Sequence, residues 1–336
     1  MEKRRLMGKQ IQWESMEPLL DEWNDLVSYK ASSDIFDLSE WQQATVISCC
    51  ASMTDHKILT QRDTSTGELL AIVPLSISNN KATFLSDYNT TDFQDLLIGD
   101  RSDSDTWHEI IDYLFKEGIE SVDLVSIKGS SSSVKEINNL QHSTSWNIEE
   151  SDWDVDPYIA LPNSWDNYLA NLRKKDRHEL KRKFRRLENS GDISYSLFDH
   201  QTQNIDSALD QFLNLMAGSK EEKARFLTED RKQFLRILTT TMSEKNFLRL
   251  FFLEIDGVKV STTMSFAHNN KLYLYNSGYN QEYRSLSVGL LLKAHNIRYA
   301  IEAGFTEFDF LRGNESYKYH LGGVDRKLHR FLVKPS

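Results

Sequence analysis

The clearest pattern of hydrophobic and polar positions lies in the C-terminal half of the chain, over residues 246–280. Three apolar, β-rich runs are separated there by Asp256-Gly257 and by His268-Asn269-Asn270. An Asp-Gly pair between apolar runs is a strong hairpin signal, and the second break consists of turn-forming residues. We therefore predict a meander of three antiparallel strands.

A helix and two further strands are expected after the meander. Ser287 stands where a helix N-cap belongs and Gly304 where a C-cap glycine belongs, and the apolar residues between them recur at helical spacing: Leu290, Leu291, Ala294, Ile297 and Ile301. Strands are predicted at 306–311 and 327–333, with a polar stretch, 312–321, between them. A strand reached through a helix should lie parallel to its neighbour, as in an α/β crossover.

Upstream of the meander, residues 164–191 have the pattern of one long amphipathic helix. Asn163 or Ser164 can cap its start, and Gly191 follows its end. The alternating run 193–198 predicts a strand, and two more helices fit 202–217 and 228–243.

The N-terminal half repeats this order of elements. Residues 56–89 predict three strands, with Asn79-Asn80-Lys81 matching Asn269-Asn270-Lys271, and residues 106–125 predict a helix and a strand. Aligning GIESVDL with GFTEFDF places Gly118 opposite Gly304 and Asp123 opposite Asp309. The shared order indicates a tandem duplication.

A chain of 336 residues is long for one domain, so two are expected. Pro157 and Pro162 punctuate a polar stretch, 141–163, in which the two copies would join. We predict an N-terminal domain over 1–145, a connection over 146–163 and a C-terminal domain over 164–336. The expected fold class is α/β (α+β), each domain having a mixed, mostly antiparallel sheet flanked by helices.

Composition is that of an ordinary water-soluble protein, with a net charge of −10 and 39% hydrophobic residues. The two cysteines, Cys49 and Cys50, are adjacent, offer no disulfide framework, and are expected in the core of an apolar helix. No apolar run approaches membrane-spanning length, and no signal-peptide core follows the basic start. These features predict a cytoplasmic protein.

Positive charge is concentrated in residues 164–190, which hold nine basic and four acidic residues, a net +5. The rest of the chain then carries −15 (−10 minus +5). Such a helix face can hold nucleic acid, an anionic membrane surface or a polyphosphate, or it can simply be solvated. Aromatic residues are poorly interleaved with the cations, which argues against a platform for single-stranded nucleic acid.

Two polar segments of the C-terminal half can carry chemistry. Arg284-x-x-Ser287-x-Gly289 enters a helix, where backbone N–H groups favour an anion, although an ordinary capped helix is the simpler interpretation. DFLRGNESYK, residues 309–318, follows a strand at a sheet edge where ligands gather, although it can also be a solvated turn. The histidines do not cluster at metal-ligand spacing, so no metal is expected.

Together these motifs resemble the GNAT superfamily of N-acyltransferases, and more narrowly its tandem-domain FemAB-like and CelD-like acetyltransferases. The resemblance covers nearly the whole chain. It is most specific over 164–190, LRKKDRHELKRKFRRLE being typical of the basic helix, and over 278–318.

The resemblance implies roles for individual residues. Arg284, Ser287, Val288 and Gly289 would cradle the pyrophosphate of coenzyme A, with Ser287 in place of the usual glycine. In the 309–318 segment, Tyr317 would be the leaving-group acid and Asp309 the base or acceptor anchor. Arg312 and Lys318 would hold an anionic donor or acceptor group, and Glu315 and His320 are rival bases. The N-terminal copy lacks the loop motif and would be a degenerate partner.

The function expected from the resemblance is transfer of an acyl group, in the simplest case acetyl, from acyl-CoA. The acceptor would be an amine or hydroxyl of a sugar, a polysaccharide or a cell-envelope precursor. The basic helix and Tyr317-Lys318, which resembles an aromatic-lysine pair of FemAB enzymes, leave open an aminoacyl-tRNA-dependent peptidyl transferase. A non-catalytic protein whose basic helix binds an acidic partner is the third possibility.

Overall fold

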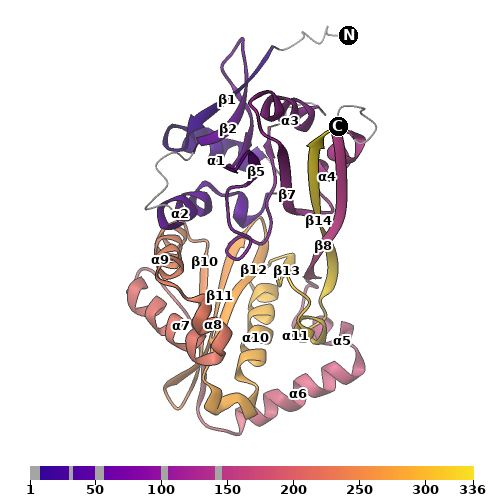
Figure 1. Cartoon of the computed structure of the whole chain (residues 1–336). Coiled ribbons are helices and arrows are strands. Elements are labelled where there is room, and N and C mark those ends of the chain that lie inside the picture. Colours follow the sequence, from indigo (N-terminus) through magenta and orange to yellow (C-terminus); the bar gives the residue numbers. More distant parts are fainter. Residues whose placement is uncertain (1–7, 30–32, 50–56, 100–104, 141–145) are drawn as a thin grey trace. The chain divides into compact units, whose positions relative to one another are not determined.

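The chain divides into two compact units (Figure 1). The structure, a computed structural model, describes residues 8–29, 33–49, 57–99, 105–140 and 146–336. One unit comprises residues 1–46, 50–155 and 326–336, and the other comprises residues 47–49 and 156–325. Of the adjacent cysteines, Cys49 ends a helix as expected, whereas Cys50 lies outside the described residues.

The first unit contains two sheets. Strands β1, β2, β3 and β6 form one, and β4, β5, β7, β14 and β8 follow one another in the other. Its helices and strands are β1 (Lys9–Ser15), η1 (Glu17–Leu19), α1 (Leu20–Tyr29), η2 (Ile35–Asp37), α2 (Ser39–Cys49), β2 (Lys57–Asp63), β3 (Leu69–Val73), β4 (Leu75–Ser78), β5 (Lys81–Phe84), β6 (Leu97–Ile98), α3 (Thr106–Lys116), β7 (Ser121–Lys128), α4 (Ser132–Leu140), β8 (Trp146–Ala160) and β14 (Val324–Pro335).

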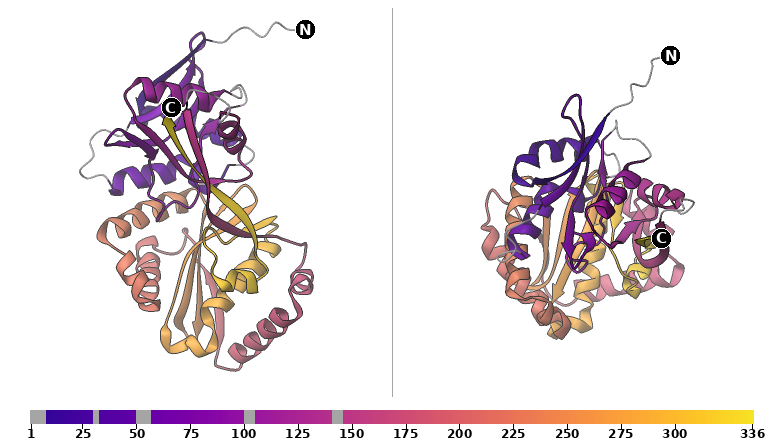
Figure 2. Two further views of the ribbon diagram at one scale, coloured as in Figure 1. Left: turned by 45° about the vertical axis from the view of Figure 1, so that its right-hand side comes forward. Right: turned by 45° about the horizontal axis from the view of Figure 1, so that its top comes forward.

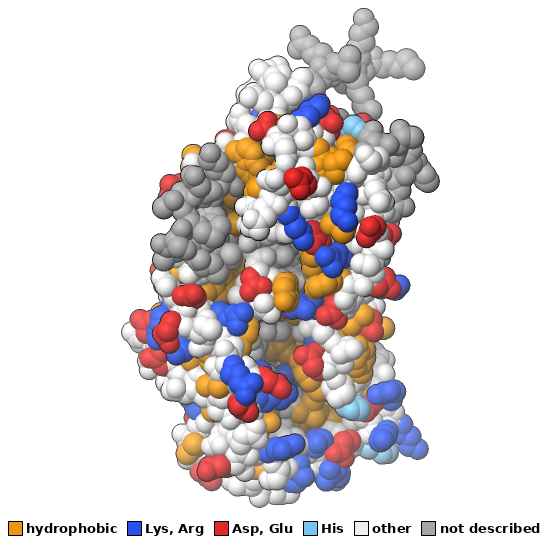
Figure 3. Space-filling model, in the orientation of Figure 1, with side chains coloured by type: hydrophobic (Ala, Val, Ile, Leu, Met, Phe, Trp, Pro, Cys, Tyr) orange, Lys and Arg blue, Asp and Glu red, His pale blue; other side chains and the backbone are white. Residues whose placement is uncertain are grey.

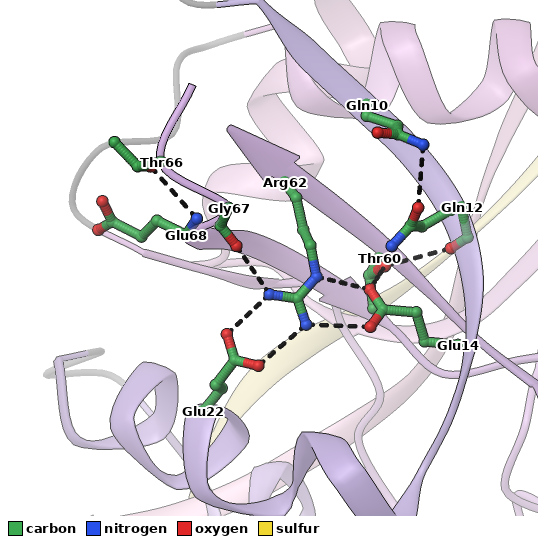
Figure 4. Close-up of polar contacts among 9 residues, drawn as sticks. All are labelled: Gln10, Gln12, Glu14, Glu22, Thr60, Arg62, Thr66, Gly67 and Glu68. Atoms are coloured by element: carbon green, nitrogen blue, oxygen red, sulfur yellow. Dashed lines mark hydrogen bonds and ion pairs between the residues drawn. The ribbon is translucent and has the colours of Figure 1, made fainter. Parts of the chain in front are cut away.

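Arg62 joins three elements of the first unit (Figure 4). Its guanidinium donates to both carboxylate oxygens of Glu14 on β1, at 2.7 and 3.0 Å, and to both of Glu22 on α1, at 2.8 and 2.9 Å. Burial raises the pKa of Glu14, but the hydrogen bonds from Arg62 and its neighbours outweigh burial and bring that pKa to about 2. Glu14 therefore stays ionised beside Arg62, and the hydrogen bonds from Arg62 to Glu22 fasten α1 to the edge of the sheet.

The second unit has a mixed sheet in the order β8, β13, β12, β11, β10, β9. All neighbouring strands are antiparallel except β12 and β13, which are parallel. Besides the end of β8, its elements are α5 (Trp165–Asn171), α6 (Lys174–Glu188), β9 (Ile193–Leu197), α7 (Ile205–Ser219), α8 (Glu221–Phe226), α9 (Glu229–Glu244), β10 (Leu248–Ile255), β11 (Val258–His268), β12 (Lys271–Tyr279), η3 (Gln281–Leu286), α10 (Val288–Glu302), β13 (Glu307–Asp309) and α11 (Ser316–His320).

Helices cover both faces of this sheet (Figure 1). Gly278 on β12 lies against the backbone of Leu215 and Met216 in α7, where a Cβ would come within 2.4 Å of main-chain atoms. Thr263 on β11 accepts a hydrogen bond from Asn296 of α10 on the opposite face. Gly278 pairs with Thr262, the residue before Thr263 on β11. Because successive residues of a strand point to opposite faces of the sheet, α7 and α10 pack on opposite faces, as the expected fold class requires. The mixed sheet flanked by helices confirms that fold class.

The predicted hairpins are confirmed. The turns at Asp256-Gly257, Asn269-Asn270 and Asn79-Asn80 all have positive φ at both central residues, between 46° and 78°. This is the geometry of a type I′ turn, which suits the twist of paired strands and favours Asn, Asp and Gly. The N-terminal strands differ in one respect, because the run 69–78 is split at Pro74 into β3 and β4, which join different sheets.

The repeat seen in the sequence has the same local geometry in both units. Thr83 pairs with Asp123 in the parallel strands β5 and β7, as Tyr273 pairs with Asp309 in β12 and β13. The glycine that follows the helix has the same left-handed conformation in both units, with φ of 88° at Gly118 and 82° at Gly304. The alignment of the two halves therefore describes real structural equivalence.

Three features differ from the sequence-based expectations. The helix expected over 164–191 is interrupted at Leu172 and Arg173, which are extended, with ψ of 146° and 140°, and Leu172 turns into the core. The expected connection, 146–163, is mostly the strand β8 in the part that the structure describes. The last strand, β14, groups mainly with the first unit because residues 328–333 pair with β7. Amphipathic spacing does not reveal a two-residue break, and strand partners depend on contacts distant in sequence.

Candidate functional site

The loop 284–289 leads into α10 through a left-handed turn. Ser287 takes the N-cap position as predicted, but it is left-handed, with φ of 61° and ψ of 32°, and its side chain makes no capping hydrogen bond. Its hydroxyl instead accepts hydrogen bonds from Lys183, at 3.0 Å, and from Arg186, at 3.2 Å. A left-handed non-glycine residue costs on the order of 1–3 kcal/mol, so these contacts from α6 support a strained turn.

Arg186 carries an unused donor beside this loop. Its Nε is buried and has no hydrogen-bond partner within the described part of the chain. The N–H groups of Val288 and Gly289 stand at the first turn of α10, where helical N–H groups lack partners within the helix. An anion there would receive charge-assisted hydrogen bonds from side chain and backbone together.

The four residues predicted to cradle a phosphate contribute differently. Val288 is fully buried and can contribute its backbone alone. Gly289 lies against the ring of Tyr279, and a Cβ at this position would come within 3.2 Å of a ring carbon. The absence of a side chain therefore allows close packing of the loop on β12. Arg284 lies in the last turn of η3 with an exposed side chain. The structure thus brings Ser287 together with Lys183 and Arg186, two residues for which the sequence indicated only a basic helix.

Lys and Arg side chains gather on the lower part of the face shown in Figure 3. By their contacts, the remaining cations of α6 and its N-cap divide into two groups. Arg173 and Arg182 pair with carboxylates of their own helix region, and Arg177 donates to main-chain oxygens of α5. Another group is exposed and has no hydrogen-bond or ion-pair partner among the described residues: Lys174, Lys175, Lys181 and Arg185. The helix is therefore neither a uniform solvated face nor a uniform anion-binding face.

The strands β12 and β13 part beside the loop. They pair only over Lys271–Tyr273 and Glu307–Asp309, whereas β12 continues to Tyr279. A bulge lies in β12 opposite Met264 and Ser265. An unpaired strand edge presents free N–H and C=O groups to an extended ligand. The opening is at the carboxyl ends of two parallel strands, where α/β proteins bind ligands.

The 309–318 segment is organised around the ammonium group of Lys318. This side chain is buried and donates to the carbonyl oxygens of Leu311, Arg312 and Gly313 at 2.8, 2.8 and 2.9 Å. Glu315 adds an ion pair at 2.9 Å. Lys318 therefore fixes a turn that includes two left-handed residues, Leu311 and Gly313. The expectation that Lys318 grips an anionic ligand does not fit this geometry.

Asp309 also serves the turn. It is fully buried, and its carboxylate accepts a hydrogen bond from the N–H of Leu311 at 2.7 Å. A carboxylate so placed is not in a position to meet a substrate, so the expected role as a base does not fit. Arg312 is half-buried, and its carbonyl oxygen is among those bound by Lys318.

Tyr317, the predicted leaving-group acid, keeps its proton. Burial raises the pKa of its hydroxyl well above the usual range, so the group is protonated. The hydroxyl has no hydrogen-bond partner among the described residues, and the ring contacts Phe310 edge to face. The ammonium of Lys293, on α10, lies 5.0 Å from the ring centroid.

Two lysines with a lowered pKa were missed by the sequence reasoning: Lys293, which is buried beside Tyr317, and Lys223, which is half-buried on α8. Burial and then repulsion by Lys223 lower the pKa of Lys293 to about 7, and burial lowers that of Lys223 to about 8. Lys223 reaches from α8 to the open end of β12, where its ammonium donates to Asn276 and to the carbonyl of Ser277. The one available signal was a lysine inside an apolar helical run, LLLKAHNI.

The two rival bases have different surroundings. Burial opposes ionisation of Glu315, but Lys318 outweighs it and lowers the pKa of that carboxylate. His320 is exposed, and its Nδ1 lies 2.9 Å from Asp176, which orients the ring.

Through the parts of the chain that the structure describes, no helix is long and apolar enough to cross a membrane. Within the same ranges no three His, Cys, Asp or Glu side chains form a metal-binding group.

Comparison with known proteins identifies a family for part of the chain. The model of the acetyltransferase (GNAT) domain family matches residues 174–319, which include α6, the 284–289 loop and Tyr317. No curated protein matches the chain in sequence.

Several solved structures share the fold over nearly the whole chain. FemX is 12% identical, with a TM-score of 0.63 and 96% of each chain covered. The C-terminal domain of a putative lysylphosphatidylglycerol synthetase from Agrobacterium fabrum is 10% identical, with a TM-score of 0.61, and 95% of this chain and 92% of that chain are covered. A tandem GNAT protein from the clavulanic acid biosynthesis pathway is 13% identical, with a TM-score of 0.53 and 98% of each chain covered. The chain thus contains a segment, residues 174–319, that matches the GNAT acetyltransferase domain family, and its overall fold is shared with FemX and with this tandem GNAT protein.

Proposed function

We propose that this protein is an acyl-CoA-dependent acyltransferase. It would move an acyl group, in the simplest case acetyl, to an amine or hydroxyl of a sugar, a polysaccharide or a cell-envelope precursor in the cytoplasm. The observation that carries the proposal is the 284–289 loop, where Lys183 and Arg186 converge on Ser287 beside the open edge of β12. Phosphates fit the loop, and an extended thioester arm fits the strand edge.

The proposed reaction needs two proton transfers. The acceptor nitrogen or oxygen attacks the thioester carbonyl, a new C–N or C–O bond forms, and the C–S bond breaks. Tyr317 is protonated and available to give its proton to the departing thiolate. The amine of Lys293, whose pKa is about 7, is neutral in a large fraction of molecules at neutral pH and can take the acceptor proton.

Thermal unfolding with and without coenzyme A, acetyl-CoA and longer acyl-CoAs tests the donor. A ligand at 100 times its dissociation constant stabilises its protein by about 2.7 kcal/mol. For a unit of this size we expect a rise of about 5–10 °C in Tm. Lys183→Gln with Arg186→Gln should remove most of the rise, whereas Lys174→Gln with Lys175→Gln should retain it. A cooperative transition that no acyl-CoA shifts would refute the donor assignment.

A second candidate is an aminoacyl-tRNA-dependent transferase. It is favoured by the cations of α6 that have no partner in the described part of the chain, and by the fold shared with FemX. It predicts tRNA binding that weakens steeply with salt, because Lys and Arg contacts to phosphates release counterions. A gel shift at low salt that shows no tRNA complex would exclude this candidate.

A further inference from the structure

A separate cavity lies in the second unit, between α5, α6, β9 and α10. Its volume is about 670 Å³, within the range of sites that bind small molecules. Its apolar walls come from all four elements: Trp165, Leu169, Phe184, Ile193, Tyr195 and His295.

The cavity is on the opposite side of α6 from the 284–289 loop. Phe184, Arg185 and Glu188 of α6 line it, whereas Lys183 and Arg186 contact Ser287. With 3.6 residues per turn, the two sets point about 180° apart around the helix. The cavity is therefore not part of the proposed donor site.

Its aromatic walls are fixed and uncharged. The rings of Tyr195 and His295 are stacked, with centroids 3.9 Å apart and planes 5° from parallel. Burial and then Arg298 lower the pKa of His295 to about 4, so the imidazole is neutral at pH 7. Trp165 meets Phe184 edge to face, with centroids 6.4 Å apart. Aromatic walls of this kind can pack against the apolar part of a ligand without forming hydrogen bonds to it.

The rim of the cavity is positively charged. Lys181, Arg185 and Arg298 stand against a single acid, Glu188, so the lining carries a net +2 (three minus one). Arg298 pairs with Glu302 at 2.8 Å. Lys181 and Arg185 have no hydrogen-bond or ion-pair partner among the described residues. In a protein whose net charge is −10, two such cations at the mouth of an apolar cavity select for negative charge.

We infer that this cavity binds a small amphipathic anion, with an apolar chain or ring among the aromatic walls and a carboxylate or phosphate at Lys181 and Arg185. The inference does not depend on the proposed transferase activity. The two sites can therefore be tested independently.

Calorimetric titration of the full chain with three ten-carbon probes separates the two recognition elements. The probes are decyl phosphate, decanol and decyltrimethylammonium, each kept below its aggregation concentration. We expect decyl phosphate to bind at one saturable site, and decyltrimethylammonium to bind at least about tenfold more weakly. Saturable binding by none of the probes, or equal binding by all three, would overturn the inference.

Charge variants locate the site. Lys181→Gln with Arg185→Gln removes two exposed rim cations, and we expect decyl phosphate to bind about tenfold more weakly. Lys174→Gln with Lys175→Gln removes the same charge from the exposed first turn of α6 and should leave affinity within about twofold. If the two double variants weaken binding equally, the anion is attracted by the basic helix as a whole, and the cavity is not its site.

Discussion

Replacing Lys318 by Met tests whether this lysine holds the protein or a ligand. The ammonium group is buried and bonded to three carbonyl oxygens and to Glu315. The bond to Leu311 is fully buried, so its carbonyl would lose its partner at a cost of about 2 kcal/mol. The carbonyls of Arg312 and Gly313 are partly buried and can regain water, which brings the total to about 3 kcal/mol.

The expected loss is measurable by unfolding. For a unit of this size, about 3 kcal/mol corresponds to a fall of about 6–12 °C in Tm. Urea denaturation of the same variant should show a lower midpoint at unchanged slope. Lys174→Met is the matched control, because Lys174 is exposed and has no partner among the residues that the structure describes. The Tm of this variant should change by less than about 2 °C.

The contrary result is equally specific. If Lys318→Met melts with the control but loses acyl-donor or tRNA binding, the lysine contacts a ligand. The hydrogen bonds to the 311–313 turn would then contribute little to stability, and the reasoning from burial would be wrong.

Three other variants test the remaining assignments. Tyr317→Phe should lower the rate of thiol release from acetyl-CoA about 100-fold with little change in donor affinity, and an unchanged rate would remove Tyr317 from the mechanism. Lys293 loses its proton near pH 7 in the folded chain but keeps it up to the ordinary pKa of 10.5 in the unfolded chain, so the free energy of unfolding should rise with pH between 7 and 10 by up to about 1.4 kcal/mol per pH unit. Lys293→Met should flatten this rise. If urea denaturation shows the same dependence on pH in the variant, the lowered pKa of Lys293 is wrong. Arg62→Met should destabilise the first unit by about 2–3 kcal/mol in urea denaturation, because the carboxylates of Glu14 and Glu22 lose their partner. Arg236→Met breaks a similar but exposed pair of contacts and should cost less than about 1 kcal/mol. Equal losses would show that burial does not strengthen the Arg62 contacts.

The sequence by itself determined the local structure. Asp256-Gly257 and the two Asn-Asn pairs predict tight turns because these residues adopt positive φ at small cost, and the structure has type I′ geometry at each. Gly304 predicts the end of α10 for the same reason. The duplication was also recognisable, because both copies need the same turns and the same parallel strand, with Asp123 and Asp309 in equivalent register.

Only the tertiary structure decided what the charged residues do. The composition of α6 shows many cations, but helix packing directs Lys183 and Arg186 to Ser287 and leaves Lys181 and Arg185 at a cavity. The sequence predicted that Lys318 and Asp309 contact a ligand or substrate, whereas in the structure both are buried and form hydrogen bonds with the backbone of their own segment. A turn depends on neighbours along the chain, whereas burial and the choice of hydrogen-bond partner depend on residues brought together from distant positions.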